Sequence, residues 1–268
     1  MKLLAIDLDG TLVNRKQEIS KKNLEALQYA YEHDVLIVPV TGRCLDSIPK
    51  QLQDSHLYNY AITSNGARIT NCINNQSIYE ECMENKTIVS FLKKCPFIYM
   101  TCHIENEYVV QGLLFTIIAK GIRGKDNKKI ITVKNLISYI EQNHKDIECI
   151  QLFIPLSKTF KKVLYLLNQQ DDLHHTNSNG PNKHYMEVFS SNTSKGEALL
   201  NLAEYLHIHQ EDIYCIGDGH NDISMFEVAN MSFAVENASS DLKEVASAIV
   251  PSNNKDGVAY AIYNYIIK

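Results

Sequence analysis

Two aspartates one residue apart follow the first apolar run of the chain. Leu3-Leu4-Ala5-Ile6 is apolar throughout, which favours a strand buried on both faces, and Asp7-Leu8-Asp9-Gly10-Thr11 follows it directly. Because side chains two residues apart on an extended chain point the same way, Asp7 and Asp9 are expected to project together from the end of this strand. Such a pair of carboxylates requires a neutralising cation or a retained proton, and a divalent metal or a lysine would supply the positive charge.

Further polar residues follow later apolar runs. Thr41 and Gly42 come after the run 35–40, the segment 217–222 comes after the run 213–216, and Lys195 falls in the first turn of a helix predicted to begin after Ser194. Ligands of open parallel sheets bind beyond the carboxyl ends of the strands, so we expect these groups to form one site. Carboxylate oxygens without clustered cysteines or histidines favour magnesium, and an aspartate beside a lysine, a hydroxyl and amides suits phosphoryl transfer. The candidate residues are Asp7, Asp9, Thr41, Gly42, Lys195, Asp218, Asn221 and Asp222.

Each of these motifs also has a simpler interpretation. An Asp-x-Asp-Gly segment is often a surface turn or a calcium-binding loop, Lys195 alone fits a solvated lysine, and the segment 217–222 fits an ordinary turn into a helix. The order of all four motifs at predicted strand ends favours a single site. His220 is interpreted as a hydrogen-bonding or surface residue rather than a metal ligand. A basic run is interpreted as a solvated loop, with a contact to a phosphate-rich substrate as the alternative; it comprises Arg123, Lys125, Lys128 and Lys129.

Strands and helices alternate at both ends of the chain. Apolar runs predict strands at 3–6, 35–40 and 60–63, and again at 213–216, 232–235 and 248–250. Helices are predicted between them, including one capped by Ser20, one that carries Leu45, Ile48 and Leu52, and a last one over 257–267. This alternation predicts an α/β fold with a doubly wound, Rossmann-like parallel sheet.

The middle of the chain follows a different pattern. Strand-like segments succeed one another at 69–71, 77–79, 97–100, 108–110, 149–154 and 185–189, with helices predicted at 87–94, 133–143 and 158–168. We interpret this stretch as an inserted α+β domain. The predicted division is residues 1–82 and 188–268 for the catalytic core and residues 83–187 for the insertion.

The composition is that of a globular protein. The 268 residues, 45% of them hydrophobic and 21% charged, suffice for one large domain or two modest ones. A net charge of -5 and a pI near 6.1 predict no bulk attraction to nucleic acid or membranes. The seven cysteines, an odd number without a CxxC pair, argue against a disulfide framework or a thiolate zinc site. Without an apolar run of membrane length or a signal-like region after Met1, the chain is expected to be cytoplasmic, as a monomer or weak homo-oligomer.

At its polar motifs the chain resembles the haloacid dehalogenase-like hydrolases, specifically the Cof-type phosphatases with a large α/β (C2B-type) cap. Residues 7–11, 41–43, 195–196 and 217–222 match the four motifs of that family in order. The insertion lies between the second and third motifs, where this subgroup carries its cap, so the resemblance covers nearly the whole chain and implies that the insertion sets substrate specificity. Residues 253–258 are similar to the closing segment of the family, whereas Val235-Glu236-Asn237-Ala238 departs from the usual Gly-Asn-Ala.

The resemblance also implies a role for each site residue. Asp7 would be the nucleophile and a metal ligand, Asp9 the acid/base and a metal ligand through its carbonyl, and Asp218 the third protein ligand. Asp222 would steady the waters of the metal. The groups that would hold phosphate are Thr41, Gly42, Lys195, Asn221 and the amide of Leu8, with Thr41 and Lys195 also acting in catalysis.

The leading hypothesis is a magnesium-dependent phosphatase. Its substrate would be a small phosphorylated metabolite, either a sugar phosphate or a nucleotide or cofactor phosphate, hydrolysed through a phospho-aspartate intermediate. A phosphomutase would keep the same aspartates but return the phosphoryl group to the substrate. A sensor of phosphorylated ligands on a hydrolase scaffold is the alternative without activity, although the intact aspartates and lysine favour an enzyme. The segment 179–185 of the insertion is predicted to contribute to substrate choice.

Overall fold

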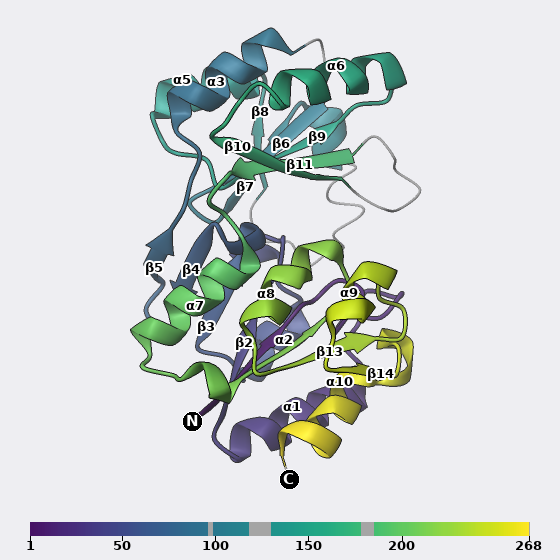
Figure 1. The fold of residues 1–268 in the computed structure, drawn as a ribbon. Helices are drawn as coiled ribbons and strands as arrows, with labels where there is room; N and C mark the ends of the chain where they lie inside the picture. Colours follow the sequence, from purple (N-terminus) through teal and green to yellow (C-terminus); the bar gives the residue numbers. More distant parts are fainter. Residues whose placement is uncertain (96–98, 118–129, 178–184, 268) are drawn as a thin grey trace. The chain divides into compact units, whose positions relative to one another are not determined.

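The chain folds into two compact units (Figure 1). The computed structural model describes residues 1–95, 99–117, 130–177 and 185–267. The first unit comprises Met1–Arg43, Ile48–Tyr79 and Ser194–Lys268, and the second comprises Cys44–Ser47 and Glu80–Thr193. No helix within the described ranges is long and apolar enough to cross a membrane.

The first unit is built on a parallel sheet with the strand order β14-β13-β12-β1-β2. Its strands are β1 (Lys2–Ile6), β2 (Val35–Pro39), β12 (Ile213–Gly217), β13 (Met231–Val235) and β14 (Ala248–Val250). The central strands are buried on both faces, and no residue from Leu3 to Ile6 exposes more than 1% of its surface. β1 pairs with β2, the next strand along the chain, on one side and with β12 on the other side. The sheet therefore reverses its strand order between β1 and β12, which is where ligands bind in such folds.

Helices connect the parallel strands of the first unit. They are α1 (Lys21–Glu32), α2 (Lys50–Ser55), α7 (Lys195–Tyr205), α8 (Ile223–Val228), α9 (Ser240–Val245) and α10 (Gly257–Ala261). α1 packs beside α10, and α7 packs beside α8 (Figure 1). The predicted N-caps are present, because the Ser20 hydroxyl accepts from the Asn23 amide at 3.1 Å and the Ser194 hydroxyl accepts from the Glu197 amide at 3.0 Å. The predicted doubly wound α/β core is confirmed.

A small sheet extends the first unit beyond β2. It has the order β3-β4-β5, with β3 (Tyr60–Thr63), β4 (Arg68–Asn71) and β5 (Gln76–Glu80). Parallel bridges join Ile37 to Tyr58 and Val40 to Ile62, so β3 lies next to β2. The helix predicted over 45–52 is divided into a 3-10 turn, Leu45–Ser47, and α2. Pro49 is the reason, because the residue before a proline is disfavoured in the helical region.

The second unit is an α+β domain with a six-stranded sheet of order β10-β11-β9-β6-β7-β8. Its strands are β6 (Tyr99–Ile104), β7 (Glu107–Gln111), β8 (Ile130–Val133), β9 (Cys149–Phe153), β10 (Leu173–Asn177) and β11 (Tyr185–Ser190). Its helices are α3 (Asn85–Lys94), α5 (Leu136–Asn143) and α6 (Ser157–Leu167). Alternate strand residues such as Cys102, Ile150 and Met186 share one apolar core with Phe91 and Ile140 of the helices. The other strand face therefore points away from this core.

Several details of the second unit differ from the predictions. β8 and β10 were not predicted, because Ile130–Val133 is short and Leu173–Asn177 is mostly polar. The helix predicted from Val133 begins only at Leu136, where the Asn135 side chain accepts from the Ser138 amide at 3.0 Å. β11 pairs with β10 as far as Ser190, and the second unit continues to Thr193, beyond residue 188, where the core was predicted to resume. Residues 97–98, the basic run 123–129 and residues 179–184 of the predicted substrate segment lie outside the described residues.

Candidate active site

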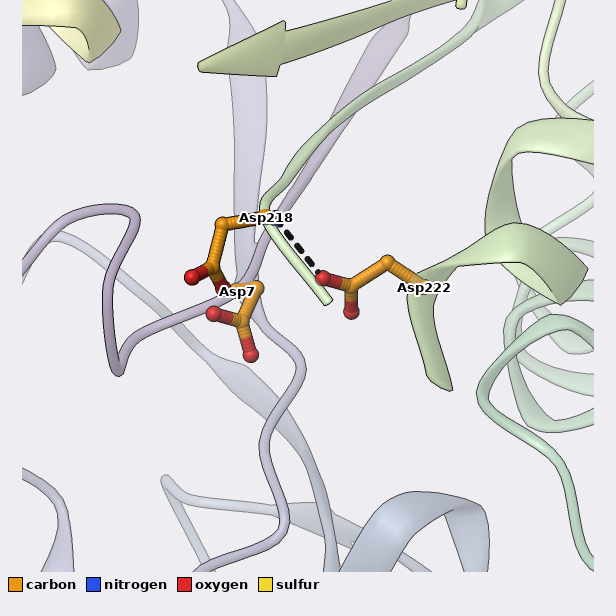
Figure 2. A group of neighbouring side chains, drawn as sticks. All are labelled: Asp7, Asp218 and Asp222. Carbon is orange, nitrogen blue, oxygen red and sulfur yellow. Dashed lines mark hydrogen bonds between the residues drawn. The ribbon is translucent and has the colours of Figure 1, made fainter. Parts of the chain in front are cut away.

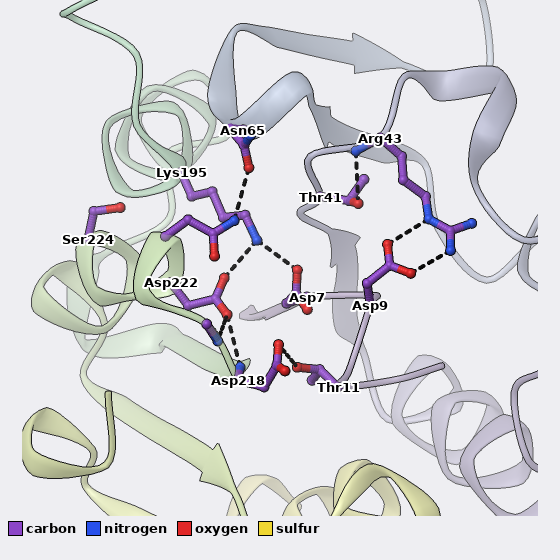
Figure 3. Close-up of polar contacts among 12 residues, drawn as sticks. Asp7, Asp9, Thr11, Thr41, Arg43, Asn65, Lys195, Asp218, Asp222 and Ser224 are labelled. Atoms are coloured by element: carbon purple, nitrogen blue, oxygen red, sulfur yellow. Dashed lines mark hydrogen bonds and ion pairs between the residues drawn. The ribbon is translucent and has the colours of Figure 1, made fainter. Parts of the chain in front are cut away.

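Asp7 and Lys195 form a buried ion pair at the end of β1. The Asp7 amide donates to the Ile216 carbonyl of β12 at 3.0 Å, which holds Asp7 at the edge of the sheet. Lys195 is the first residue of α7 and is only 1% exposed. Its Nζ donates to Asp7 Oδ1 and to Asp222 Oδ1, both at 2.7 Å (Figure 3). A lysine so deeply buried is stable only with such partners.

Asp218 and Asp222 complete this buried cluster from the turn after β12. Asp222 Oδ2 accepts the backbone N–H groups of Asp218 and Gly219, each at 2.9 Å, so this carboxylate shapes the turn. Asp218 Oδ1 accepts from the Thr11 hydroxyl at 3.4 Å. Figure 2 shows the carboxylates of Asp7, Asp218 and Asp222 together, with one oxygen from each lying within 4.8 Å of the others. The structure thus brings together residues that are more than 200 positions apart in the chain.

The carboxylates of this cluster carry more negative charge than one lysine neutralises. Burial raises the pKa of Asp7 well above its ordinary value; Lys195 partly offsets the rise, whereas Asp222 and Asp218 add to it. Burial, followed by the Asp222 carboxylate, raises the pKa of Asp218 to about 7. Burial lowers the pKa of Lys195, but the carboxylates of Asp222 and Asp7 outweigh burial and hold it above its ordinary value. The lysine is therefore charged, and the cluster favours a further cation.

The donor set fits a divalent metal ion. Asp7 Oδ2 is buried and has no hydrogen-bond partner among the described residues, although a buried carboxylate oxygen normally has one. Asp218 supplies a second carboxylate within reach, and all the donors are hard oxygen atoms of the kind that magnesium and calcium bind.

Asp9 does not join the buried cluster. Its carboxylate accepts from Arg43 Nε at 2.7 Å and from Arg43 Nη2 at 2.5 Å (Figure 3). Arg43 also donates to Gln17 Oε1 at 2.8 Å. The expectation that Asp7 and Asp9 project together is not met, because β1 ends at Ile6 and the chain turns at once. The Val13 amide, for example, bonds the Leu8 carbonyl at 2.8 Å. Alternation along an extended chain therefore does not apply at Asp9.

Gly10 fits a position that no other residue could occupy without strain. Its φ of +86° lies in the region that favours glycine, and a Cβ atom there would be 2.1 Å from Asp218 Oδ2. The Gly10 carbonyl accepts from Asn237 Nδ2 at 2.8 Å, and Asn237 Oδ1 accepts from the Asn253 amide at 2.9 Å. Asn253 Nδ2 in turn donates to the Val13 carbonyl at 2.9 Å. The closing segment of the chain thus holds the loop that follows Asp7, and the departure from Gly-Asn-Ala keeps the asparagine that makes this contact.

The remaining predicted residues lie in the first unit around the same strand ends. Thr41 is 1% exposed, and its hydroxyl accepts from the Arg43 amide at 3.1 Å. Asn221 donates from Nδ2 to Asn65 Oδ1 at 3.0 Å. Arg43 and Asn65 were not among the predicted site residues. Arg43 had a signal, since it completes the Thr41-Gly42-Arg43 segment, but Asn65 belongs to none of the four motifs.

The whole chain matches one family of hydrolases. Residues 4–262 match the family model described as haloacid dehalogenase-like hydrolase. The chain belongs to this family. It is 31% identical to the 5-amino-6-(5-phospho-D-ribitylamino)uracil phosphatase YwtE of Bacillus subtilis, over 98% of this chain and 97% of that protein, and 28% identical to the phosphatase YwpJ of the same organism, over 97% and 98%. The prediction of a phosphatase of this family is confirmed.

Solved structures support the same assignment. A haloacid dehalogenase-like hydrolase from Bacteroides thetaiotaomicron has a TM-score of 0.84 at 25% identity, with 98% of both chains covered. A haloacid dehalogenase-like hydrolase from B. subtilis has a TM-score of 0.85 at 25% identity, covering 99% of this chain and all (100%) of that one. A subclass IIB sugar phosphatase, BT4131, has a TM-score of 0.81 at 24% identity over 99% of each chain, and so shares the fold. The core with an inserted α+β domain is therefore the fold of this family.

Proposed function

We propose that this protein is a magnesium-dependent phosphatase that hydrolyses a small phosphorylated metabolite through a phosphorylated Asp7. The observation that carries the proposal is the state of the Asp7 carboxylate. Lys195 fixes Oδ1 at 2.7 Å, whereas Oδ2 is buried without a hydrogen-bond partner among the described residues. A carboxylate that is positioned by a charged lysine, and that keeps one oxygen uncommitted, is suited to attack phosphorus.

Asp7, Asp218 and the backbone carbonyl of Asp9 would hold the magnesium ion, and Asp222 would steady its waters. When bound, the ion offsets negative charge on the phosphoryl group. Lys195 would neutralise a further part of this charge, since its ammonium lies between Asp7 and Asp222. The groups proposed to hold the phosphate oxygens are the Lys195 ammonium, the Thr41 hydroxyl, the Gly42 and Leu8 backbone and the Asn221 amide.

Hydrolysis would proceed in two steps. In the first, an Asp7 oxygen bonds to phosphorus, the bond from phosphorus to the leaving oxygen breaks, and Asp9 gives that oxygen a proton. In the second, Asp9 takes a proton from water, the water oxygen bonds to phosphorus, and the bond from phosphorus to the Asp7 oxygen breaks, which releases inorganic phosphate and the Asp7 carboxylate. Because Arg43 holds the Asp9 carboxylate in a two-point ion pair, Asp9 must exchange this partner for the substrate oxygen before it can act.

The substrate is proposed to be a sugar phosphate or a nucleotide or cofactor phosphate. Two of the curated relatives, 31% and 30% identical, are named 5-amino-6-(5-phospho-D-ribitylamino)uracil phosphatases, which makes that compound the first to assay. The insertion, predicted as residues 83–187, is proposed to select the substrate, because the motif residues would act on the phosphoryl group that all phosphorylated metabolites share. A cytoplasmic location and a monomeric or weakly homo-oligomeric state remain predictions from the sequence.

The test is release of phosphate from p-nitrophenyl phosphate and from a panel of phosphorylated metabolites, with magnesium and with chelator. Activity should require magnesium and should return when it is restored. Rapid-quench mass spectrometry should find phosphate on Asp7 in the wild type and none in Asp7→Asn. Turnover in metal-free buffer, or phosphate on another residue, would contradict the proposal. Return of the phosphoryl group to the substrate instead of water would identify a phosphomutase.

A further inference from the structure

Three consecutive residues with left-handed backbone follow β3 in the first unit. Ser64, Asn65 and Gly66 have φ values of +51°, +59° and +108°, and all three residues are buried. Residues other than glycine adopt this region at an energetic cost and keep it only where their surroundings hold them. Because such strain gathers at functional sites, the contacts of this turn are informative.

The turn is held from two sides. The backbone N–H of Ser64 donates to the Arg43 carbonyl at 2.9 Å, and the backbone N–H of Asn65 donates to the Thr41 carbonyl at 3.0 Å. On the other side, a Cβ atom on Gly66 would lie 2.1 Å from the carbonyl oxygen of Ser194, the residue that caps α7. The turn therefore packs between the loop after β2 and the N-terminus of α7, which carries Lys195.

The Asn65 side chain reaches two groups assigned to the phosphate. The residue is 2% exposed, and its Oδ1 accepts from Asn221 Nδ2 at 3.0 Å. A Cβ atom on Gly42 would lie 3.0 Å from Asn65 Oδ1 and 3.2 Å from Nδ2, so the amide packs directly on the Gly42 backbone. A primary amide nitrogen has two hydrogens. With one directed at Asn65, the Asn221 amide keeps the other for a phosphate oxygen.

We propose that Asn65 is a positioning residue for phosphate binding. It fixes the orientation of the Asn221 amide and the position of the Gly42 backbone, so that both donors are in place before phosphate arrives. The left-handed backbone of the turn Ser64–Gly66 places the Asn65 side chain beside Gly42 and Asn221. This inference rests on the proposed function, because Gly42 and Asn221 are assigned to the phosphate by it.

Asn65→Gly tests the side chain separately from the backbone, because glycine adopts the left-handed region freely. Asn75→Gly is the matched control, since Asn75 also has a left-handed backbone, with φ of +57°, but is exposed and lies between β4 and β5. The measurements are the inhibition constant of inorganic phosphate with saturating magnesium, kcat and KM for p-nitrophenyl phosphate, and thermal unfolding. Asn65→Gly should weaken phosphate binding by about 2- to 10-fold, the effect of one hydrogen bond, and Asn75→Gly should leave it unchanged.

Asn221→Ala completes the test. If Asn65 acts through Asn221, Asn65→Gly should weaken phosphate binding much less in the Asn221→Ala background than in the wild type. Asn65→Ser serves if the glycine variant does not fold, because the shorter serine side chain lacks the Oδ1 atom that accepts from Asn221 Nδ2. Unchanged phosphate affinity in either Asn65 variant, or independent effects of Asn65→Gly and Asn221→Ala, would overturn the inference. A wild-type protein that neither binds phosphate nor hydrolyses phosphomonoesters would instead overturn the proposed function.

Discussion

Replacing Lys195 by methionine should destabilise the first unit by about 3–5 kcal/mol in metal-free buffer at pH 8. The Lys195 side chain is 0% exposed, and the side chains of its partners Asp7 and Asp222 are 7% and 0% exposed. Methionine keeps much of the length of the lysine but removes the ammonium from two contacts of 2.7 Å. Loss of one partner from a buried ion pair costs about 3–5 kcal/mol, because the other charge stays buried and unpaired.

The loss of stability should be smaller at pH 5.5. Burial raises the pKa of Asp7 well above its ordinary value, and burial with the Asp222 charge raises the pKa of Asp218 to about 7. A carboxyl group whose pKa is raised in the folded state binds a proton more readily there, so it contributes stability that is lost as the pH rises through the folded pKa. In the variant at pH 5.5, protons bound to these carboxylates therefore remove the negative charge that the Lys195 ammonium neutralises in the wild type. The pKa of Lys195 is raised, so the wild-type lysine stays charged at both pH values.

The assay is urea unfolding followed by far-UV circular dichroism with chelator present, since the chain has no tryptophan to report by fluorescence. Because the chain has two units, the unfolding curve is fitted with two transitions, and only the transition of the first unit should shift. Lys255→Met is the matched control in the same unit. Its ammonium lies 3.0 Å from Glu236 Oε2, but the two side chains are 67% and 57% exposed, and solvent screens such a pair so that it adds little to stability.

Two results would refute this reasoning. A loss for Lys195→Met no larger than that for Lys255→Met would show that the buried carboxylates do not need the lysine. Equal losses of stability at pH 5.5 and pH 8 would show that protons on the carboxylates do not compensate for the missing lysine. The pKa values of the buried carboxyl groups would then not be raised as described.

Three further variants test the proposed chemistry. Asp218→Asn should weaken magnesium binding, measured by calorimetry, by more than about tenfold, while the folded shape is kept because asparagine can still accept from Thr11. Asp9→Asn should slow turnover of an alkyl phosphate by roughly 10²–10⁴-fold, with a smaller effect on the first step for p-nitrophenyl phosphate, whose leaving group needs little protonation. Asp7→Asn should remain folded and bind inorganic phosphate but yield no phosphoenzyme by rapid-quench mass spectrometry. Normal magnesium affinity, normal alkyl phosphate turnover or a trapped phosphoenzyme in the respective variant would count against the roles assigned.

The parallel core could be predicted because its strands are apolar on both faces. Leu3–Ile6 and Ile213–Ile216 carry a signal that needs no knowledge of their neighbours, and Ser20 and Ser194 mark the starts of their helices chemically. β10 had no such signal. Its residues Leu173–Asn177 include two histidines, a threonine and an asparagine, and it forms a strand because β11 provides a partner along its length. Pairing of this kind is tertiary information.

The site was predictable in composition but not in detail. The order of the motifs along the chain indicates which residues are involved, and the bond from Lys195 to Asp7 joins residues 188 positions apart. The position of the Asp9 side chain depends on Arg43, which no periodicity reveals. The left-handed backbone at Asn65 has only the following glycine as a local sign, and glycine after asparagine is common in ordinary turns.

The strand order explains why these residues converge at all. The neighbours of β1 are β2 on one side and β12 on the other, and the connections leave the sheet in opposite directions from these two strands. In sheets of this kind ligands bind beyond the carboxyl ends of the strands where the order reverses, and Asp7 and Asp218 directly follow β1 and β12. Burial there makes carboxylates costly, so the fold must supply positive charge nearby. α7 supplies one charge through Lys195, which leaves an excess of two negative charges among Asp7, Asp218 and Asp222 when all three are ionised. A divalent cation matches that excess, and protonation of Asp218 near pH 7 is the alternative that remains when the cation is removed.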